Sequence, residues 1–455
     1  MIKRANDDGY CLETRNGKGP MGKSGTMKDE RRGMTIAEKI IARAAGRSWV
    51  APGEYVTAKI DIAMMNDNIR YIPALLQKAG IKEGAFRIWD RERFVVIIDH
   101  RVPTPSLADA ANHKKAREAA LSLDVGHFYD IFEGVSHQVM VEKGHALPGE
   151  LVVGADSHAT TYGALNALGT GIGVTEMAYV AKTGQLWFKV PETIRFDLKG
   201  TLPEYVSAKD IALFVAGCYG TDMAQYRAIE WSGPGAAELS IDGRLTLANM
   251  SLELGAKFAV FQADTKTEEF LHARAHRAFH PVAPDPDARY VRIYPLDVSS
   301  LVPQVARPHN VGNVGAITEV VGVPIQQALI ASCCNGRIDD IQAAARIVKG
   351  KKVKKGVRFY VNPASREVYQ TALKRGIIST LIEAGVMIGI PSCGFCNYFG
   401  GAMAAGETCI AALPRNFKGR MGNPDAKIYL ASPETVAASA VAGVIVDPRE
   451  VVCCQ

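Results

Sequence analysis

Four short apolar runs in this chain of 455 residues each end in side chains that can bind a metal or a carboxylate. The runs and the residues that follow them are 94–98 with Asp99-His100, 151–155 with Asp156-Ser157-His158, 328–331 with Ser332-Cys333, and 386–390 with Ser392-Cys393. Helical patterns alternate with these runs, which predicts an α/β protein with mostly parallel sheets. Ligands of such sheets bind beyond the carboxyl ends of the strands, so the four polar groups are expected to form one composite site.

The same pattern suggests three domains behind a terminal extension. Residues 1–33 are basic and glycine-rich, and we predict a disordered extension there. The predicted α/β domains are 34–191, 192–295 and 296–455, of which the last carries the clustered cysteines. Proline-rich residues 280–295 are interpreted as a linker between the second and third domains.

Helix-capping signals locate several helices. Thr35 and Glu38 form a capping box before an amphipathic segment, and Ser207 with Asp210 opens a helix in the second predicted domain. A late helix is expected to begin after Ser432 and to close at Gly443. The lysine run 349–355 is interpreted as a solvated surface between a helix and a strand.

Three of the nine cysteines have the placement of metal ligands. Cys393 and Cys396 form a C-x-x-C after a predicted strand, and Cys333 follows another. An odd, clustered set suits a metal site in a reducing compartment better than a disulfide framework. Three thiolates suit a 4Fe–4S cluster with one iron left open. A zinc site that also uses Cys334, and plain buried thiols, remain open alternatives.

The amino-acid composition and net charge limit the classes of protein to which this chain can belong. The chain is 47% apolar and 22% charged, as expected for a folded globular protein. No apolar run is long enough for a membrane span and no signal-peptide core precedes the first helix, so we expect a cytoplasmic protein with no membrane partner. The formal charge of +6 is compatible with small anionic substrates and makes nucleic acid an unlikely partner.

Four segments of the chain resemble motifs of the aconitase superfamily. They are VGADSH at 153–158, ASCCNGRIDD at 331–340, SCGFC at 392–396 and RNFKGR at 415–420. The resemblance runs in order from about residue 34 to residue 447, and it implies a three-domain arrangement around a central iron–sulfur site. Length and start match the separate large subunits of the family's two-chain dehydratases, which are hydro-lyases of 2-hydroxydicarboxylic acids such as isopropylmalate.

The resemblance also implies roles for individual residues. Cys333, Cys393 and Cys396 would hold a 4Fe–4S cluster. The implied catalytic residues are Asp99, His100, His137, Asp156, His158 and Glu253. The implied substrate-binding residues are Asn66, Ser157, Asn249, Arg415 and Arg420.

Each implied role follows ordinary chemistry. Asp99 would orient His100, whose imidazolium would protonate the departing hydroxyl. Asp156 would pair with one of the other two histidines and Glu253 with the second. Asn249 and Glu253 are expected one turn apart on one helix face. The two arginines would clamp a carboxylate.

The chain departs from the family pattern at four positions. Cys334, Pro414, Ser392 and Asn66 stand where relatives usually carry threonine, asparagine, glycine, and glutamine or histidine. These changes favour a smaller acid, such as 2,3-dimethylmalate, citramalate or malate, as an alternative substrate.

The swivelling domain that supplies the family's serine base has no counterpart in this sequence. We therefore expect a separate small subunit of roughly 150 to 210 residues to provide it.

Two functions from other classes are weighed against this interpretation. Residues 169–174 are glycine-rich, but Val174 breaks the dinucleotide-binding fingerprint, which favours close packing of a helix start. An RNA-binding apo-protein would require a basic patch interleaved with aromatic residues. Aromatic residues make up only 7% of the chain, and the lysine run contains none.

Overall fold

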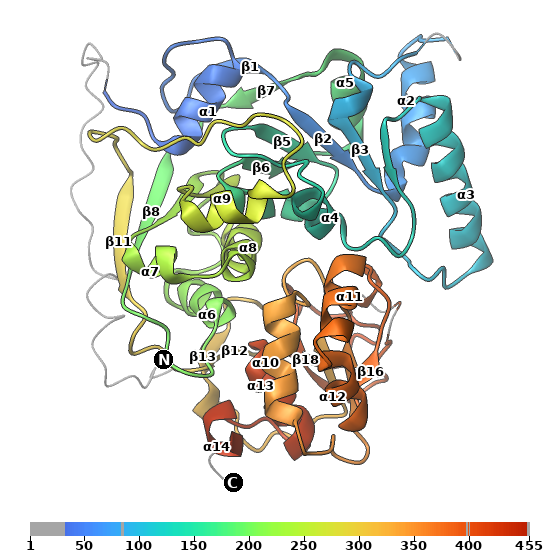
Figure 1. The fold of residues 1–455 in the computed structure, drawn as a ribbon, viewed down its shortest axis with the longest axis vertical. Coiled ribbons are helices and arrows are strands. Elements are labelled where there is room, and N and C mark those ends of the chain that lie inside the picture. The colour runs from blue at the N-terminus through green and yellow to red at the C-terminus, as the bar shows by residue number, and fades with distance from the viewer. Residues whose placement is uncertain (1–31, 83–85, 397–398, 400, 453–455) are drawn as a thin grey trace. The chain divides into compact units, whose positions relative to one another are not determined.

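A five-stranded parallel sheet carries the first half of the site. The computed structural model describes residues 32–82, 86–396, 399 and 401–452 (Figure 1). The strands, in sheet order, are β4 (His127–Tyr129), β3 (Phe94–Ile97), β2 (Ile62–Met65), β5 (Leu151–Gly154) and β6 (Leu168–Gly171). The helices of this part are α1 (Ile36–Ala44), α2 (Ile72–Lys78), α3 (Leu107–Ser122), α4 (Ser136–Glu142) and α5 (Val174–Thr183). Strands β2, β3 and β5 are fully buried, as continuous apolar runs predict.

Two further sheets accompany the first. Antiparallel β1 (Tyr55–Lys59) and β7 (Gln185–Lys189) form a two-stranded sheet. The four-stranded parallel sheet has the order β10 (Phe258–Phe261), β9 (Ala228–Ser232), β8 (Thr193–Lys199) and β11 (Arg292–Asp297). Its helices are α6 (Ala208–Tyr219), α7 (Pro234–Glu238), α8 (Ile241–Met250) and α9 (Thr265–His272).

A seven-stranded mixed sheet carries the cysteine segments. Its order is β13 (Val314–Ala316), β12 (Gln304–Ala306), β18 (Lys427–Leu430), β17 (Thr408–Ala412), β14 (Gln327–Ile330), β15 (Arg358–Val361) and β16 (Met387–Ile388). Pairing is parallel from β18 through β16, whereas β12 is antiparallel to both of its neighbours. The helices are α10 (Ile338–Val348), α11 (Arg366–Lys374), α12 (Ile377–Glu383), α13 (Pro433–Ala442) and α14 (Pro448–Val452).

Six short 3-10 helices complete the elements of the described residues. They are η1 (Asp67–Tyr71), η2 (Arg91–Arg93), η3 (Ser157–Leu165), η4 (Ser251–Leu254), η5 (Ile317–Glu319) and η6 (Gly394–Cys396). No helix within the described ranges has the length and apolarity needed to cross a bilayer.

The sequence signals for individual elements are largely confirmed. The capping boxes at Thr35 and Ser207 are both formed, and α13 begins after Ser432 and closes at Gly443. The lysine run 349–355 is mostly exposed between α10 and β15.

The linker prediction for residues 280–295 is wrong at its end. Residues 292–295 belong to β11, which pairs with β8 in parallel. Pro295 is tolerated in this strand because β11 lies at the edge of the sheet, where a residue without an N–H group can be accommodated. The prediction for residues 1–33 lies outside the described residues except at its last two positions.

A glycine lets η3 press against the neighbouring sheet. A Cβ atom on Gly163 would lie 1.6 Å from the carbonyl oxygen of Ala259 in β10. Any larger residue there would push η3 away from β10, so the side chains that η3 carries depend on this contact.

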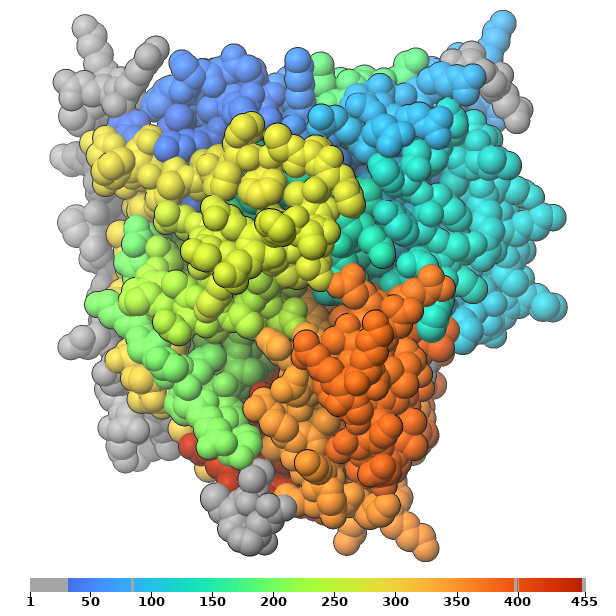
Figure 2. Space-filling view, viewed as in Figure 1, coloured from blue at the N-terminus to red at the C-terminus, as the bar shows by residue number. Residues whose placement is uncertain are grey.

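The first and last sheets meet through hydrogen bonds near α4. Gly134 forms an antiparallel bridge with Ser365, and Val135 N–H donates to the carbonyl oxygen of Ala364 at 2.8 Å. Ser365 Oγ donates to the carboxyl group of Glu142 at 2.7 Å. In Figure 2 the orange surface of the last part directly adjoins the teal surface of the first. Residues more than 220 positions apart in the sequence therefore form one continuous interface.

Burial controls the ionisation of Glu142 in this interface. Its side chain is only 6% exposed, and burial raises its pKa from 4.5 to about 7 despite hydrogen bonds from Gln138 and Ser365. A carboxyl group whose pKa is higher in the folded protein than in the unfolded chain adds to the free energy of unfolding at pH values below the unfolded pKa. That contribution is lost as the pH rises from about 4.5 through about 7.

Glu142→Gln should therefore remove a pH dependence from stability. Relative to the wild type, we expect the free energy of unfolding of the variant to be higher at about pH 8 than at about pH 5, by roughly 2–3 kcal/mol. Denaturant unfolding at both pH values measures this. Glu118→Gln, at an exposed glutamate of α3, is the control. An equal effect of both substitutions at both pH values would contradict the argument.

Candidate active site

The polar ends of the strands meet around one cavity of about 130 Å³. Its described lining consists of Asp99, His100, Val135, His137, Asp156, Ser157, His158, Cys333, Cys393, Cys396, Arg415 and Arg420. The carboxyl ends of β3 and β5 contribute Asp99, His100, Asp156 and His158, and the ends of β14 and β17 contribute Cys333 and Arg415.

 Eleven of the fourteen site residues expected from the sequence line the cavity, and Asn66, Asn249 and Glu253 lie behind it.

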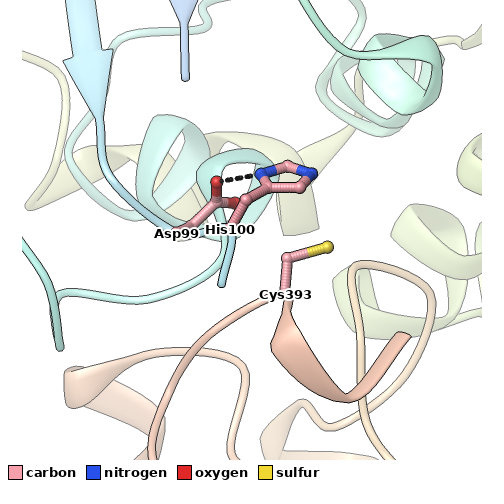
Figure 3. A group of neighbouring side chains, drawn as sticks. All are labelled: Asp99, His100 and Cys393. Atoms are coloured by element: carbon pink, nitrogen blue, oxygen red, sulfur yellow. Dashed lines mark hydrogen bonds and ion pairs between the residues drawn. The ribbon is translucent and has the colours of Figure 1, made fainter. Parts of the chain in front are cut away.

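Asp99 and His100 form a hydrogen-bonded pair at the end of β3 (Figure 3). His100 Nδ1 lies 2.7 Å from Asp99 Oδ1, and its Nε2 lies 3.7 Å from Asp156 Oδ2. Burial lowers the pKa of His100, but the carboxylates of Asp99, Asp156 and Asp67 outweigh burial and raise this pKa to about 10. The imidazole is therefore held as a proton donor whose Nε2 side faces the cavity.

His137, at the start of α4, is fixed through both ring nitrogens. Its Nε2 lies 2.8 Å from Asp156 Oδ1, and its Nδ1 lies 3.0 Å from Tyr162 Oη. Burial raises the pKa of Tyr162 well above 10, so its hydroxyl stays protonated and donates to Nδ1. This network assigns the ring proton to Nε2, which donates to Asp156.

His158 and Arg415 share the carboxylate of Glu253. His158 Nε2 lies 2.9 Å from Glu253 Oε1, and Arg415 Nε donates to the same oxygen at 2.7 Å. Burial lowers the pKa of His158, but Cys333, Asp156 and Glu253 outweigh burial and hold this pKa well above its usual value. Both pairings expected for Asp156 and Glu253 are thus present, although Glu253 lies in η4, beyond the end of α8, rather than on the same helix as Asn249.

The three thiols lie among cationic groups. Arg420 Nη2 donates to Cys396 Sγ at 2.7 Å. A hydrogen bond from Cys393 lowers the pKa of Cys396, and the Arg420 charge lowers it further. Burial raises the pKa of Cys333, but His158 and His137 outweigh burial and lower it. Two of the three thiols are therefore shifted toward the thiolate, which is the form that binds metals.

Cys334 is turned away from the other thiols. Its Sγ accepts a hydrogen bond from the buried amino group of Lys209 in α6, at 3.2 Å, and it does not line the described cavity. Lys209 Nζ also donates to the carbonyl oxygen of Leu413 at 2.6 Å. This orientation leaves Cys333, Cys393 and Cys396 as the three thiols of the site. Cys333, Cys334, Cys393, Cys396 and Cys409 are free thiols.

The arrangement fits a three-thiolate cluster better than a single ion. Among the described residues, Asp99, His100 and Cys393 form the one group of metal-capable side chains with ligand atoms all within 4.8 Å (Figure 3). Asp99 Oδ1 pairs with His100, and its Oδ2 accepts from Ser136 N–H at 2.7 Å. This group contains one of the three thiols in the cavity, so a single ion bound there would leave Cys333 and Cys396 unused.

Two of the expected substrate-binding residues serve as internal supports. Asn66 caps η1 by accepting from Asn68 N–H at 3.1 Å, and it donates to the carbonyl oxygen of Ala155 at 3.2 Å. Asn249 is fully buried in α8 and donates to Thr161 Oγ1 at 2.9 Å. Both residues therefore contact the segments that carry the cavity lining rather than the cavity itself.

Three residues near the site were missed by the sequence analysis. Asp67 is buried, and its Oδ1 lies 3.7 Å from His100 Nδ1. Tyr162 holds His137, and Val135 is the one aliphatic side chain in the described lining. Asp67 could have been found, because it also follows the end of a buried strand, β2.

The glycine-rich segment 169–174 packs closely against η3 and the turn before it. A Cβ atom on Gly169 would lie 2.1 Å from the carbonyl oxygen of Ala159, and one on Gly171 would lie 2.7 Å from that of Asp156. The glycines thus allow β6 to lie against the turn that carries Asp156 and His158.

Known proteins with similar sequences cover nearly the whole chain. Residues 77–324 and 316–443 match the family model Aconitase family (aconitate hydratase). The chain is 49% identical over 418 residues to 3-isopropylmalate dehydratase large subunit 1 of Methanopyrus kandleri, with 92% of this chain and 99% of that protein covered. It is 46% identical over 417 residues to the probable 3-isopropylmalate dehydratase large subunit of Methanothermobacter thermautotrophicus, with 91% and 99% covered. The large subunit from Heliobacterium modesticaldum is 43% identical over 422 residues, with 92% and 100% covered.

The orientations of the thiols predict which cysteines retain iron. After anaerobic reconstitution with iron and sulfide, the wild type should bind about four irons per chain and show broad visible absorbance. Cys333→Ser, Cys393→Ser and Cys396→Ser should each lose most of this absorbance, whereas Cys334→Ser should keep it. Cys409→Ser, a buried thiol in β17, controls for loss of a sulfur elsewhere. Tightly bound zinc in the wild type would refute the assignment.

Proposed function

This chain belongs to the aconitase family, and we propose that it is the large subunit of a 4Fe–4S hydro-lyase that interconverts isopropylmalate isomers by dehydration and rehydration. The observation that carries the proposal is the single cavity in which three thiols, a carboxylate-held histidine and two arginines converge. The near full-length similarity to proteins named as 3-isopropylmalate dehydratase large subunits supports the substrate.

Cys333, Cys393 and Cys396 would hold the cluster. Their thiols line the same cavity, and Arg420 and His158 provide positive charge beside them. When bound, the cluster would supply Lewis-acid activation of the leaving hydroxyl. These fixed cations stabilise the thiolate forms of Cys333 and Cys396.

His100 is proposed as the acid that protonates the departing hydroxyl. Asp99 holds its Nδ1 at 2.7 Å, which leaves Nε2 directed at the cavity. The three surrounding carboxylates favour the imidazolium, so a proton is available at Nε2. His137 and His158 would then orient substrate oxygens.

Arg415 and Arg420 are proposed to bind substrate carboxylate groups. The Arg415 guanidinium donates from Nε to Glu253 Oε1 at 2.7 Å and from Nη2 to Ser157 Oγ at 3.4 Å. A guanidinium anchored on one edge can present its remaining N–H groups to a carboxylate in fixed geometry. Arg420 is anchored in a similar way through Cys396.

A partner chain is proposed to supply the base. Dehydration next to a carboxylate requires removal of a carbon-bound proton, and the lining offers an acid and a clamp for this reaction but no serine on a swivelling domain. The relatives are named as large subunits, which supports a small subunit as the source of that domain.

The substrate is proposed to be isopropylmalate rather than a smaller acid. The smaller acid was favoured by Asn66 and Pro414, but Asn66 faces a main-chain carbonyl behind the cavity. Its departure from the family pattern therefore does not reshape the described lining. Val135 offers the substrate one aliphatic contact in this half of the site.

Activity should require both chains. We expect the reconstituted chain alone to be inactive. Addition of its small subunit should restore formation of the unsaturated acid from isopropylmalate, which is measured by the absorbance of that acid. Loss of a general base alone typically costs about 100- to 10,000-fold in rate. Citramalate and malate are the comparison substrates. Robust turnover by the isolated chain would place the base within this sequence and contradict the proposed division of labour.

Removal of the His100 imidazole, the proposed acid, should lower the turnover rate. In the two-chain enzyme, His100→Asn should lower kcat by about 100- to 10,000-fold, with a much smaller change in KM. His272→Asn, at an exposed histidine at the end of α9, is the control. If His100→Asn raised KM and left kcat unchanged, His100 would be a binding residue rather than the acid.

A further inference from the structure

Arg337 is a buried arginine within the motif that carries Cys333, and the proposed function assigns it no role. Its side chain is 1% exposed. Nη2 donates to the carbonyl oxygen of Cys333 at 2.5 Å, and Nη1 donates to that of Cys334 at 2.6 Å. The guanidinium therefore holds two successive peptide groups of the loop that presents Cys333.

The third edge of the same guanidinium contacts α4. Arg337 Nε donates to Gln138 Oε1 at 2.9 Å, across 199 positions of sequence. Gln138 is 4% exposed and directly follows His137. Among the described residues, the guanidinium thus bonds to main-chain, amide and hydroxyl oxygens rather than to a carboxylate.

The amide orientation of Gln138 is fixed from its other side. Gln138 Nε2 donates to Glu142 Oε1 at 2.8 Å, one turn along α4, and the same oxygen accepts from Ser365 Oγ. Because the amide nitrogen is bound to a carboxyl oxygen, Oε1 must face Arg337. The chain of contacts from Ser365 to Cys333 therefore has one consistent set of donors and acceptors.

We propose that Arg337 and Gln138 are paired positioning residues that set the place of the Cys333 loop relative to the helix that carries His137. This inference rests on the proposed function, because it gives the pair its purpose at a cluster ligand. A planar fork with three edges matches the three acceptors, whereas a lysine could satisfy only part of them. Loss of either partner would leave buried polar groups unpaired and allow the loop to shift.

The test measures how firmly the reconstituted chain retains iron. Gln138→Leu, Arg337→Lys and the double variant are challenged anaerobically with a chelator, and the decay of the visible absorbance is followed. We expect each single variant to lose iron about 10-fold faster than the wild type, and the double variant to be no faster than the faster single one, because both break the same link. Gln138→Glu keeps an acceptor for Arg337 Nε, so at about pH 6, where Glu142 is largely protonated, it should stay within about twofold of the wild type.

A packing control separates positioning from general loss of stability. Val141→Ala removes a fully buried aliphatic side chain of α4 and should lower the thermal midpoint without changing iron loss more than about twofold. Iron loss from Gln138→Leu and Arg337→Lys that matches Val141→Ala, or additive effects in the double variant, would overturn the pairing. A wild type that takes up no iron–sulfur cluster would instead refute the proposed function and the inference with it.

Discussion

Asp99 is the residue on which the rest of the site depends. Its Oδ1 holds His100, its Oδ2 accepts from Ser136 N–H at the start of α4, and its carbonyl oxygen accepts from Cys393 N–H at 2.9 Å. Three parts of the site, the proposed acid, the helix of His137 and the segment of two thiols, therefore share one almost fully buried aspartate. A carboxylate whose two oxygens are both hydrogen-bonded has little freedom to reorient.

The sequence was sufficient to predict the strand-end groups, because they depend on local order. A buried run followed by a polar residue places that residue at the carboxyl edge of a parallel sheet, and Asp99, Asp156 and Cys333 all lie there. Capping boxes such as that of Thr35 are equally local. The family resemblance then identified which of the nine cysteines belong together.

Contacts between distant segments could not be predicted in this way. Cys334 follows Cys333 directly, yet its orientation is set by Lys209, 125 positions earlier. Asn66 stands at a strand end like the other site residues, but the cap that it forms on η1 turns it toward Ala155. Spacing and periodicity carry no information on such choices, since they follow from how separately formed sheets pack together.

The wide separation of the two walls of the cavity has a consequence for biosynthesis. The wall with Asp99, His137 and His158 is encoded well before residue 300, whereas Cys333, Cys393 and Cys396 are added later. Domains fold largely in the order in which they leave the ribosome, so the histidine wall can be in place before the thiols emerge. The thiols are then added beside groups that are already ordered, and His158 and His137 are the ones that lower the pKa of Cys333.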